Sequence, residues 1–210
     1  PDAAICDWLG RLDEKSSEDV LSDMSQKDLR QWKRKHVGHR SFTVLRHPVA
    51  RVHTAFCNHI LSTGEGSYVE IRKTLRKVHN VPLPNDPSDE SYDTAAHRTA
   101  FLAWLVFLKA NLNAQTALRV DGTWASQLVM LQGMATFGVP DMILREDRLR
   151  GDLAMLAGQM GLTSMPEPLP VSDPHAEILA AIYDSEIEQA ARDACQRDYT
   201  AFGFGNWQPR

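Results

Sequence analysis

The stretch from Ser41 to Phe56 holds residues whose types and spacing suit the binding of an anion. Arg46 follows a short β-branched and apolar run, Phe42 to Leu45, which favours a strand. Pro48 suits the first position of a helix, because its missing N–H would be unpaired there in any case. Arg46 is therefore predicted between a strand end and the positive end of a helix, where a guanidinium and backbone N–H groups bind phosphate together. The alternative is that Arg46 simply pairs with a carboxylate.

Helices that alternate with short strands are predicted around this segment. Caps, apolar periodicity and stop signals predict helices over Ser16 or Ser17 to Met24, Ser25 to Gly38, Pro48 to Leu61, Tyr68 to Val78, Ala95 to Leu112, Arg148 to Met160, Asp173 to Tyr183 and Ser185 to Tyr199. Strands are predicted at Phe42 to Leu45 and Met142 to Leu144. This order indicates an α/β fold with a largely parallel sheet, in which ligands bind at the carboxyl ends of the strands.

Two further stretches allow predictions about burial. The helix from Ala95 to Leu112 is apolar on nearly all sides, which is typical of a mostly buried helix. Val81 to Asp89 is rich in proline and aspartate, so we expect an exposed loop there.

The run Phe-Thr-Val-Leu-Arg-His-Pro-Val-Ala-Arg-Val-His-Thr-Ala-Phe resembles the 3′-phosphate-binding segment of the carbohydrate sulfotransferases. That family includes the bacterial nodulation-factor enzymes and the Golgi glycan enzymes, and this chain resembles the soluble bacterial branch. Three later segments are similar to the family in the same order: Asp121 to Gln127, Asp141 to Asp152 and Ile182 to Phe204. The resemblance implies one sulfotransferase-like domain over residues 1–210, with a helix-rich, three-layer, P-loop-like α/β fold and a small, mostly parallel sheet.

The resemblance also implies a donor and its ligands. The donor would be 3′-phosphoadenosine 5′-phosphosulfate, without a metal, and the acceptor a hydroxyl group, which we expect on a glycan. Arg46 matches the family's arginine for the 3′-phosphate, and Thr54 stands where serine is usual and keeps the hydroxyl donor. The alternative for Thr54 is a hydrogen bond to its own preceding helical turn. Arg51 matches a second arginine, which could be a ligand or an ion-pair partner.

The sequence offers several candidates for the catalytic base. His47, His53 and His97 are candidates because imidazole titrates near neutrality, and a residue before Pro1 is an equal one. The family's Trp motif has a histidine where this chain has Thr123, so no role passes to that position. His47 alternatively fills a tolerant position before proline.

One element that the resemblance implies does not occur in residues 1–40. The family binds the 5′-phosphosulfate with a strand, a loop and a helix that carry a basic residue, and this stretch contains no glycine-rich phosphate loop. We expect that segment, with the catalytic basic residue, to precede Pro1. The alternative is a protein that cannot bind the sulfonate end.

Net charge, hydropathy and cysteine content limit the partners and the location that we expect for this protein. A net charge of −4 gives no general affinity for nucleic acid or anionic membranes, so we expect neither as a partner. No apolar run approaches the ~20 residues of a membrane span. The three cysteines are few, odd in number and widely spaced, which implies no disulfide framework and favours the reducing cytoplasm.

Two other readings of the side chains are weaker. His53, Cys57 and His59 invite a metal site because residues four apart share a helix face, but a fourth ligand is not evident, and Cys57 alternatively is a small buried hydrophobe. His36 and the basic residues near it suggest nucleic-acid contact, for which a solvated helix end is the commoner explanation.

Three functions are therefore in competition. The leading hypothesis is a sulfotransferase. The second is a non-catalytic nucleotide-binding or interaction domain on the same scaffold, and the third is a P-loop kinase, for which no Walker-type motif is visible. The identity of the acceptor and the oligomeric state stay open.

Overall fold

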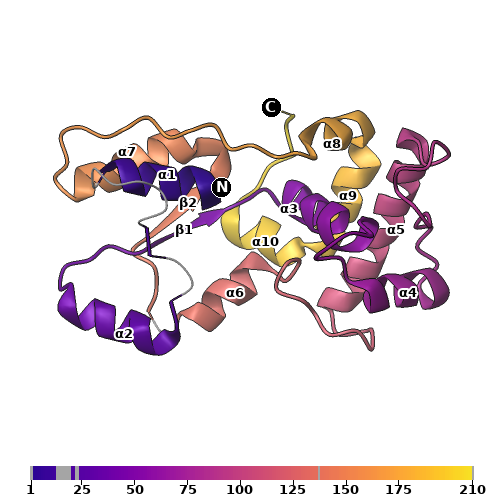
Figure 1. Ribbon diagram of the computed structural model, residues 1–210, viewed down its shortest axis with the longest axis horizontal. Coiled ribbons are helices and arrows are strands. Elements are labelled where there is room, and N and C mark those ends of the chain that lie inside the picture. Colours follow the sequence, from indigo (N-terminus) through magenta and orange to yellow (C-terminus); the bar gives the residue numbers. More distant parts are fainter. Residues whose placement is uncertain (1, 13–19, 22–23, 137, 210) are drawn as a thin grey trace. The chain divides into compact units, whose positions relative to one another are not determined.

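The computed structural model describes residues 2–12, 20–21, 24–136 and 138–209 (Figure 1). The chain divides into two compact units. Unit 1 consists of Pro1–Arg46 and Met134–Ser172, and unit 2 of His47–Gly133 and Asp173–Arg210. The single domain over residues 1–210 stays a prediction. No helix in the described part of the chain has the length and apolar character needed to cross a membrane.

Unit 1 contains a two-stranded parallel sheet. Strand β1 (Phe42–Leu45) pairs with β2 (Met142–Arg145), and Val44 lies opposite Leu144. The helices of this unit are α1 (Asp2–Leu12), α2 (Gln26–Lys35), the 3-10 turn η3 (Glu146–Arg148) and α7 (Leu149–Gln159). The helix-rich α/β class with a small parallel sheet is thus confirmed for the described residues, whereas the P-loop-like arrangement stays a prediction.

The core of unit 1 forms between two helices and the sheet. Trp8 of α1, Leu144 of β2 and Leu153 of α7 are each fully buried and belong to one apolar cluster. The Trp8 indole Nε1 donates a hydrogen bond to the Pro166 carbonyl at 3.0 Å, so the extended connector after α7 is fixed to α1.

Local signals set several boundaries in unit 1 as predicted. Ser25 is the N-cap of α2, and its Oγ accepts a hydrogen bond from the Asp28 N–H at 3.2 Å. Gly38 and Gly161 follow α2 and α7 with φ of +90° and +77°, values that favour glycine. Most of the predicted helix from Ser16 or Ser17 to Met24 lies outside the described residues, and its described residues 20, 21 and 24 are not helical. Helix α1 was not predicted.

Unit 2 consists of helices around an aromatic core. The elements are α3 (Pro48–Ala55), the π-helical turn η2 (Phe56–Leu61), α4 (Val69–Val78), α5 (Thr94–Leu112), α6 (Gln127–Met134, whose last residue belongs to unit 1), α8 (Ala176–Ile182), α9 (Ser185–Ala194) and α10 (Gln196–Phe202). Helix α5 packs against α8 and α9. Phe56, Phe101 and Trp104 are fully buried, and the ring of Phe56 contacts the rings of the other two.

Helix α5 is mostly buried, as predicted, although its Val106 is 68% exposed. Two other predictions for unit 2 were wrong in detail. In the loop expected to be exposed, Val81 and Leu83 are buried, because apolar side chains next to prolines still find the core. The predicted helix from Ser185 to Tyr199 is interrupted at Cys195, where φ is −105° and ψ is 29°.

The burial pattern of β2 leads to a stability prediction. Leu144 is 0% exposed and its neighbour Ile143 is 46% exposed, because successive side chains of a strand point to opposite faces. We expect Leu144→Ala to lower the free energy of unfolding by about 3 kcal/mol. The matched variant Ile143→Ala should lower it by less than about 1 kcal/mol. Urea denaturation measures both, and equal losses would contradict the placement of β2.

Candidate functional site

Arg46 lies at the carboxyl edge of the sheet in unit 1, as predicted. The last residues of the two strands, Leu45 and Arg145, are paired, so Arg46 and Glu146 leave the sheet at the same edge. The Arg46 Nε lies 3.2 Å from Glu146 Oε2, and the two side chains are only 13% and 11% exposed. The alternative reading of Arg46, pairing with a carboxylate, is therefore realised in this structure.

The turn after β2 is ordered by its own carboxylates. Asp152 accepts a hydrogen bond from the Arg145 backbone N–H at 2.8 Å, which ties the start of α7 to the strand end. Asp147 forms an ion pair of 2.7 Å with the Arg145 guanidinium. These two acidic residues fix the shape of the turn that presents Glu146 to Arg46.

Arg51 and Thr54 lie on α3, in unit 2. The Arg51 guanidinium donates to the carbonyls of Ala125 at 2.7 Å and of Gly122 at 2.9 Å. The Thr54 hydroxyl donates to the Ala50 carbonyl at 3.0 Å and lies 3.5 Å from Asp173 Oδ2. Arg51 thus holds a loop in place, and Thr54 makes the bond to its own preceding turn that was the alternative to ligand binding.

The loop that Arg51 holds is also held by Asp198. This buried carboxylate, 2% exposed, accepts hydrogen bonds from Ser126 Oγ at 2.6 Å and from the N–H groups of Gln127 at 3.0 Å and Leu128 at 3.1 Å. Asp198 therefore caps the start of α6 from another helix. It supplies the acceptor that the first N–H groups of a helix lack.

His47 connects the start of α3 to the C-terminal segment. Its Nε2 lies 3.1 Å from the Gly205 carbonyl, which can only accept, so the proton of that bond is on Nε2. Its ring meets the rings of Tyr199 and Phe204 edge-on, with centroids 5.6 Å and 5.2 Å away. As a catalytic base His47 would have to act through Nδ1.

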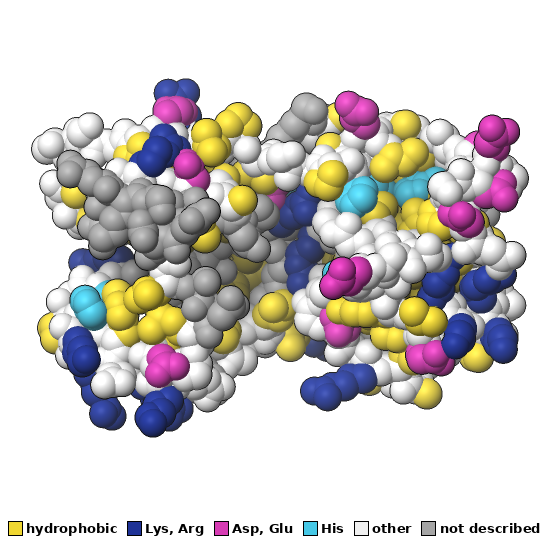
Figure 2. All heavy atoms as spheres, in the orientation of Figure 1, with side chains coloured by type: hydrophobic (Ala, Val, Ile, Leu, Met, Phe, Trp, Pro, Cys, Tyr) yellow, Lys and Arg dark blue, Asp and Glu magenta, His cyan; other side chains and the backbone are white. Residues whose placement is uncertain are grey.

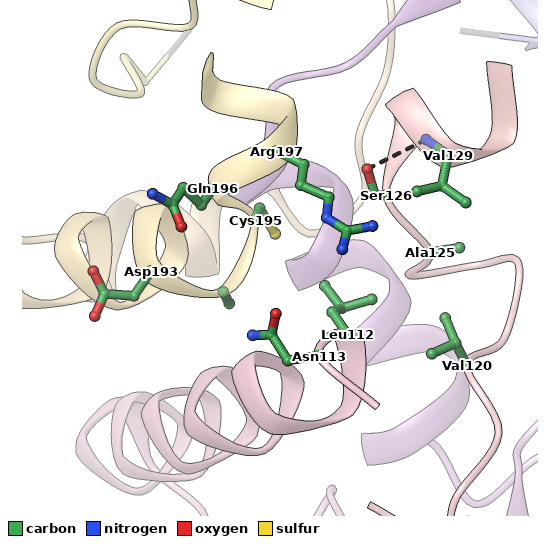
Figure 3. A pocket seen from close by; sticks show the side chains of 11 residues that line it. Leu112, Asn113, Val120, Ala125, Ser126, Val129, Asp193, Cys195, Gln196 and Arg197 are labelled. Atoms are coloured by element: carbon green, nitrogen blue, oxygen red, sulfur yellow. Dashed lines mark hydrogen bonds between the residues drawn. The ribbon is translucent and has the colours of Figure 1, made fainter. Parts of the chain in front are cut away.

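Beside the Asp198 cap lies a cavity of about 210 Å³. It is lined by the end of α5, the segment before α6 and the junction of α9 with α10. Figure 3 shows the guanidinium of Arg197 pointing into the space between α10 and Ser126. A small polar or anionic ligand in this cavity would meet one cation.

The other two base candidates meet each other in the interior of unit 2. His53 Nε2 lies 3.0 Å from His97 Nε2, and Cys57 Sγ lies 3.6 Å from His53 Nε2. His59 does not join this cluster, because its Nδ1 contacts the Gly66 carbonyl at 3.0 Å. The predicted trio of His53, Cys57 and His59 is thus corrected to a trio with His97, which comes from α5 and could not be found by local spacing.

Burial dominates the electrostatics of this cluster. It lowers the pKa of His97 to about 4, and the nearby His175 adds to the shift. It raises the pKa of the Cys57 thiol to about 12, with a further contribution from the charge of Asp173. Both side chains are therefore neutral near pH 7.

Comparisons of the chain with protein-family models, with curated proteins and with solved structures found no match. We therefore infer the function from the four segments that carry the resemblance and from their geometry. In unit 1, the segment that ends in Arg46 contacts the acidic turn. In unit 2, α3, the loop before α6 and the C-terminal segment contact one another.

Removal of the Asp198 charge should destabilise unit 2. Asp198→Asn keeps the shape but replaces one of the acceptor oxygens by a donor that faces buried N–H groups. We expect the free energy of unfolding to fall by about 2–3 kcal/mol. In the control Asp193→Asn, the carboxylate is 41% exposed and pairs with Lys109, so a loss below about 1 kcal/mol is expected. Chemical denaturation measures both, and equal values would contradict the structural role of Asp198.

The low pKa of His97 makes stability depend on pH. The unfolded chain takes up a proton near pH 6.5, whereas the folded protein resists protonation of His97 down to about pH 4. This contribution to stability is complete above pH 6.5 and is lost as the pH falls toward 4. The loss should reach roughly 3 kcal/mol.

The variant His97→Gln serves as the control, because it lacks this titration. Urea denaturation of both proteins in a chelating buffer, at several pH values, should show that the stability difference between them shrinks as the pH falls. Parallel pH profiles would exclude His97 as a buried neutral imidazole.

Proposed function

We propose that this chain is a sulfotransferase domain, which transfers the sulfuryl group of 3′-phosphoadenosine 5′-phosphosulfate to a hydroxyl of a carbohydrate or other small acceptor. The observation that carries the proposal is that the segments resembling the carbohydrate sulfotransferases contact one another in the folded chain. Within each unit, such contacts are expected of segments that build a site together.

In unit 1 the supporting contact is at the edge of the sheet. Arg46 stands at the carboxyl end of a parallel strand, where α/β proteins bind their ligands. The ion pair between the Arg46 Nε and Glu146 orients the guanidinium at this edge. We therefore propose Arg46 as the ligand of the donor's 3′-phosphate, with Glu146 as the residue that orients it.

In unit 2 the supporting contacts involve Arg51, His47 and Asp198. Arg51 binds carbonyls of the loop before α6, His47 binds the Gly205 carbonyl, and Asp198 caps α6. These contacts favour a positioning role for Arg51 rather than direct contact with the donor. Thr54 is the weaker ligand candidate, because the carboxylate of Asp173 lies beside its hydroxyl and would repel a phosphate.

Sulfuryl transfer requires little covalent participation by the protein. The acceptor oxygen attacks sulfur, the bond from sulfur to the bridging phosphate oxygen breaks, and the hydroxyl proton passes to a base. Adenosine 3′,5′-bisphosphate leaves. By analogy with phosphoryl transfer, catalysis comes from in-line positioning and from neutralisation of charge on the leaving oxygen. Arg46 would contribute to positioning, because it holds a part of the donor that does not react.

The test of this proposal compares adenosine 3′,5′-bisphosphate with AMP by isothermal titration calorimetry. We expect the wild-type chain to prefer the bisphosphate, and Arg46→Ala to raise its dissociation constant at least roughly tenfold. The matched control is Arg40→Ala in the same unit, because Arg40 is 47% exposed and lies 3.8 Å from Asp141. It should leave the dissociation constant unchanged. Equal affinities in wild type and Arg46→Ala would remove Arg46 from the site.

A transfer assay separates the enzyme from the non-catalytic alternative. The chain, together with any residues that its gene encodes before Pro1, is incubated with the donor carrying labelled sulfate and with a panel of glycans, and the label on sugar hydroxyls is measured. Transfer that depends on Arg46 would support the sulfotransferase. A preference for the 3′-phosphate without any transfer would support a nucleotide-binding domain instead.

A further inference from the structure

A group of metal-ligating side chains lies in the interior of unit 2. His53, Cys57 and His97 each offer one ligand atom, and these atoms all lie within 4.8 Å of one another. The three side chains are buried, with exposed fractions of 0%, 7% and 4%. Two imidazoles and a thiol that converge are typical ligands of zinc.

The fold explains how these residues meet. His53 lies on α3 and Cys57 in the π-helical turn η2 that continues it, four residues later, so both face the same side. His97 lies on the first turns of α5, whose start is capped by Asp93. π-Helical turns are rare and frequently occur at functional sites. The cluster is thus assembled from two segments that are 40 residues apart in sequence.

Two of the three distances between the ligand atoms are close to those of a tetrahedral zinc site. Zinc binds imidazole nitrogen at about 2.0–2.1 Å and sulfur at about 2.3 Å, which places neighbouring ligand atoms roughly 3.3–3.7 Å apart. The observed separations are 3.0 Å between His53 Nε2 and His97 Nε2, and 3.6 Å between His53 Nε2 and Cys57 Sγ. The third separation, between Cys57 Sγ and the ligand atom of His97, lies within 4.8 Å, so these two side chains must draw closer when a metal ion binds.

A second contact orients His97. Its Nδ1 lies 3.2 Å from the Tyr92 hydroxyl oxygen. When Nδ1 carries the proton and donates it to that oxygen, Nε2 presents its lone pair to the cluster. Histidine ligands of metals almost always use their second nitrogen in this way.

The cluster adjoins an open cavity of about 420 Å³, which is lined by Cys57, His97, Tyr92 and His175. Figure 2 shows histidine side chains among apolar ones on this part of the surface, between α8 and the start of α5. The His53 and His175 rings have centroids 6.3 Å apart, so His175 belongs to the surroundings of the cluster. A water molecule from the cavity can fill the fourth position, as in zinc sites that keep an open coordination position.

We propose that His53, Cys57 and His97 bind one zinc ion, with a water molecule as the fourth ligand. The thiol of Cys57 loses its proton to solvent when its sulfur binds the metal. This proposal uses none of the residues assigned to donor binding, and it removes His53 and His97 from the candidates for the catalytic base. It changes the expectation from the sequence that the protein needs no metal.

Cobalt is the probe that tests the site, because a thiolate bound to Co²⁺ absorbs light in the near ultraviolet. The full chain is freed of metal with a chelator and titrated with Co²⁺. We expect one equivalent to produce the charge-transfer band together with the intense visible bands of tetrahedral cobalt, and one equivalent of Zn²⁺ to abolish both. Absence of the charge-transfer band overturns the proposal.

Variants identify the ligands. Cys57→Ser should abolish the charge-transfer band, whereas the controls Cys195→Ser and Cys6→Ser should keep it. His97→Gln should weaken cobalt binding at least roughly tenfold, and the control His59→Gln should not. A band that persists in Cys57→Ser, or that is lost in a control instead, overturns the assignment.

The melting temperature gives a second test of metal binding, which can be used when a variant is less stable than the wild type. Zn²⁺ should raise the Tm of the wild-type chain, because a metal that binds only the folded state stabilises it. It should raise the Tm of the control Cys195→Ser equally, and leave that of Cys57→Ser unchanged. Circular dichroism confirms that each variant is folded before it is titrated. An unchanged Tm of the wild type would overturn the proposal.

Discussion

The buried carboxylate of Asp198 is the contact on which much of unit 2 depends. A charge removed from water is costly unless donors surround it, and Asp198 accepts from one hydroxyl and two backbone N–H groups. Those N–H groups open α6, so the preceding loop ends where Asp198 lies. Arg51 holds the same loop from its other side through two carbonyls. One anion and one cation therefore fix a single loop between α3 and α10, and both are satisfied mainly by backbone groups.

The pair of Arg46 and Glu146 in unit 1 has a different character. Both side chains are nearly buried, and their mutual attraction offsets the loss of hydration that each would suffer alone. A phosphate at Arg46 would have to share the guanidinium with Glu146. Because a phosphate carries more negative charge than a carboxylate, it can bind the shared guanidinium more strongly than Glu146 does. The carboxylate meanwhile keeps the guanidinium oriented in the free protein, which reduces the entropy lost on binding.

Helix boundaries could be predicted from the sequence where the residues that set them are local. They could not be predicted where a residue distant in sequence sets the boundary. Ser25, Pro48 and Gly161 mark helix ends by their own chemistry, and each boundary was confirmed within about two residues. The start of α6 depends on Asp198, 71 residues further along the chain from Gln127, so no local pattern revealed it.

The same distinction applies to the candidate site. Arg46 could be placed at a strand end because strand and proline are adjacent in sequence. Its partner Glu146 follows the other strand, 100 residues later, and could be paired with it only once the register of the sheet was known. Helical spacing correctly placed His53 and Cys57 in one cluster, but it added His59 as the third ligand. The actual third residue, His97, comes from α5 and joins the cluster only through tertiary packing.

Helix α3 shows how one short element can serve two sites. Successive residues of a helix are separated by about 100°, so Arg51 and His53 point to sides roughly 200° apart. Arg51 accordingly reaches the loop before α6, while His53 faces α5 and meets His97. Thr54 lies between these two directions and contacts Asp173. With α3 held on both sides, a change of orientation at one of its faces must disturb the other, which leaves the helix little freedom to move when a ligand binds.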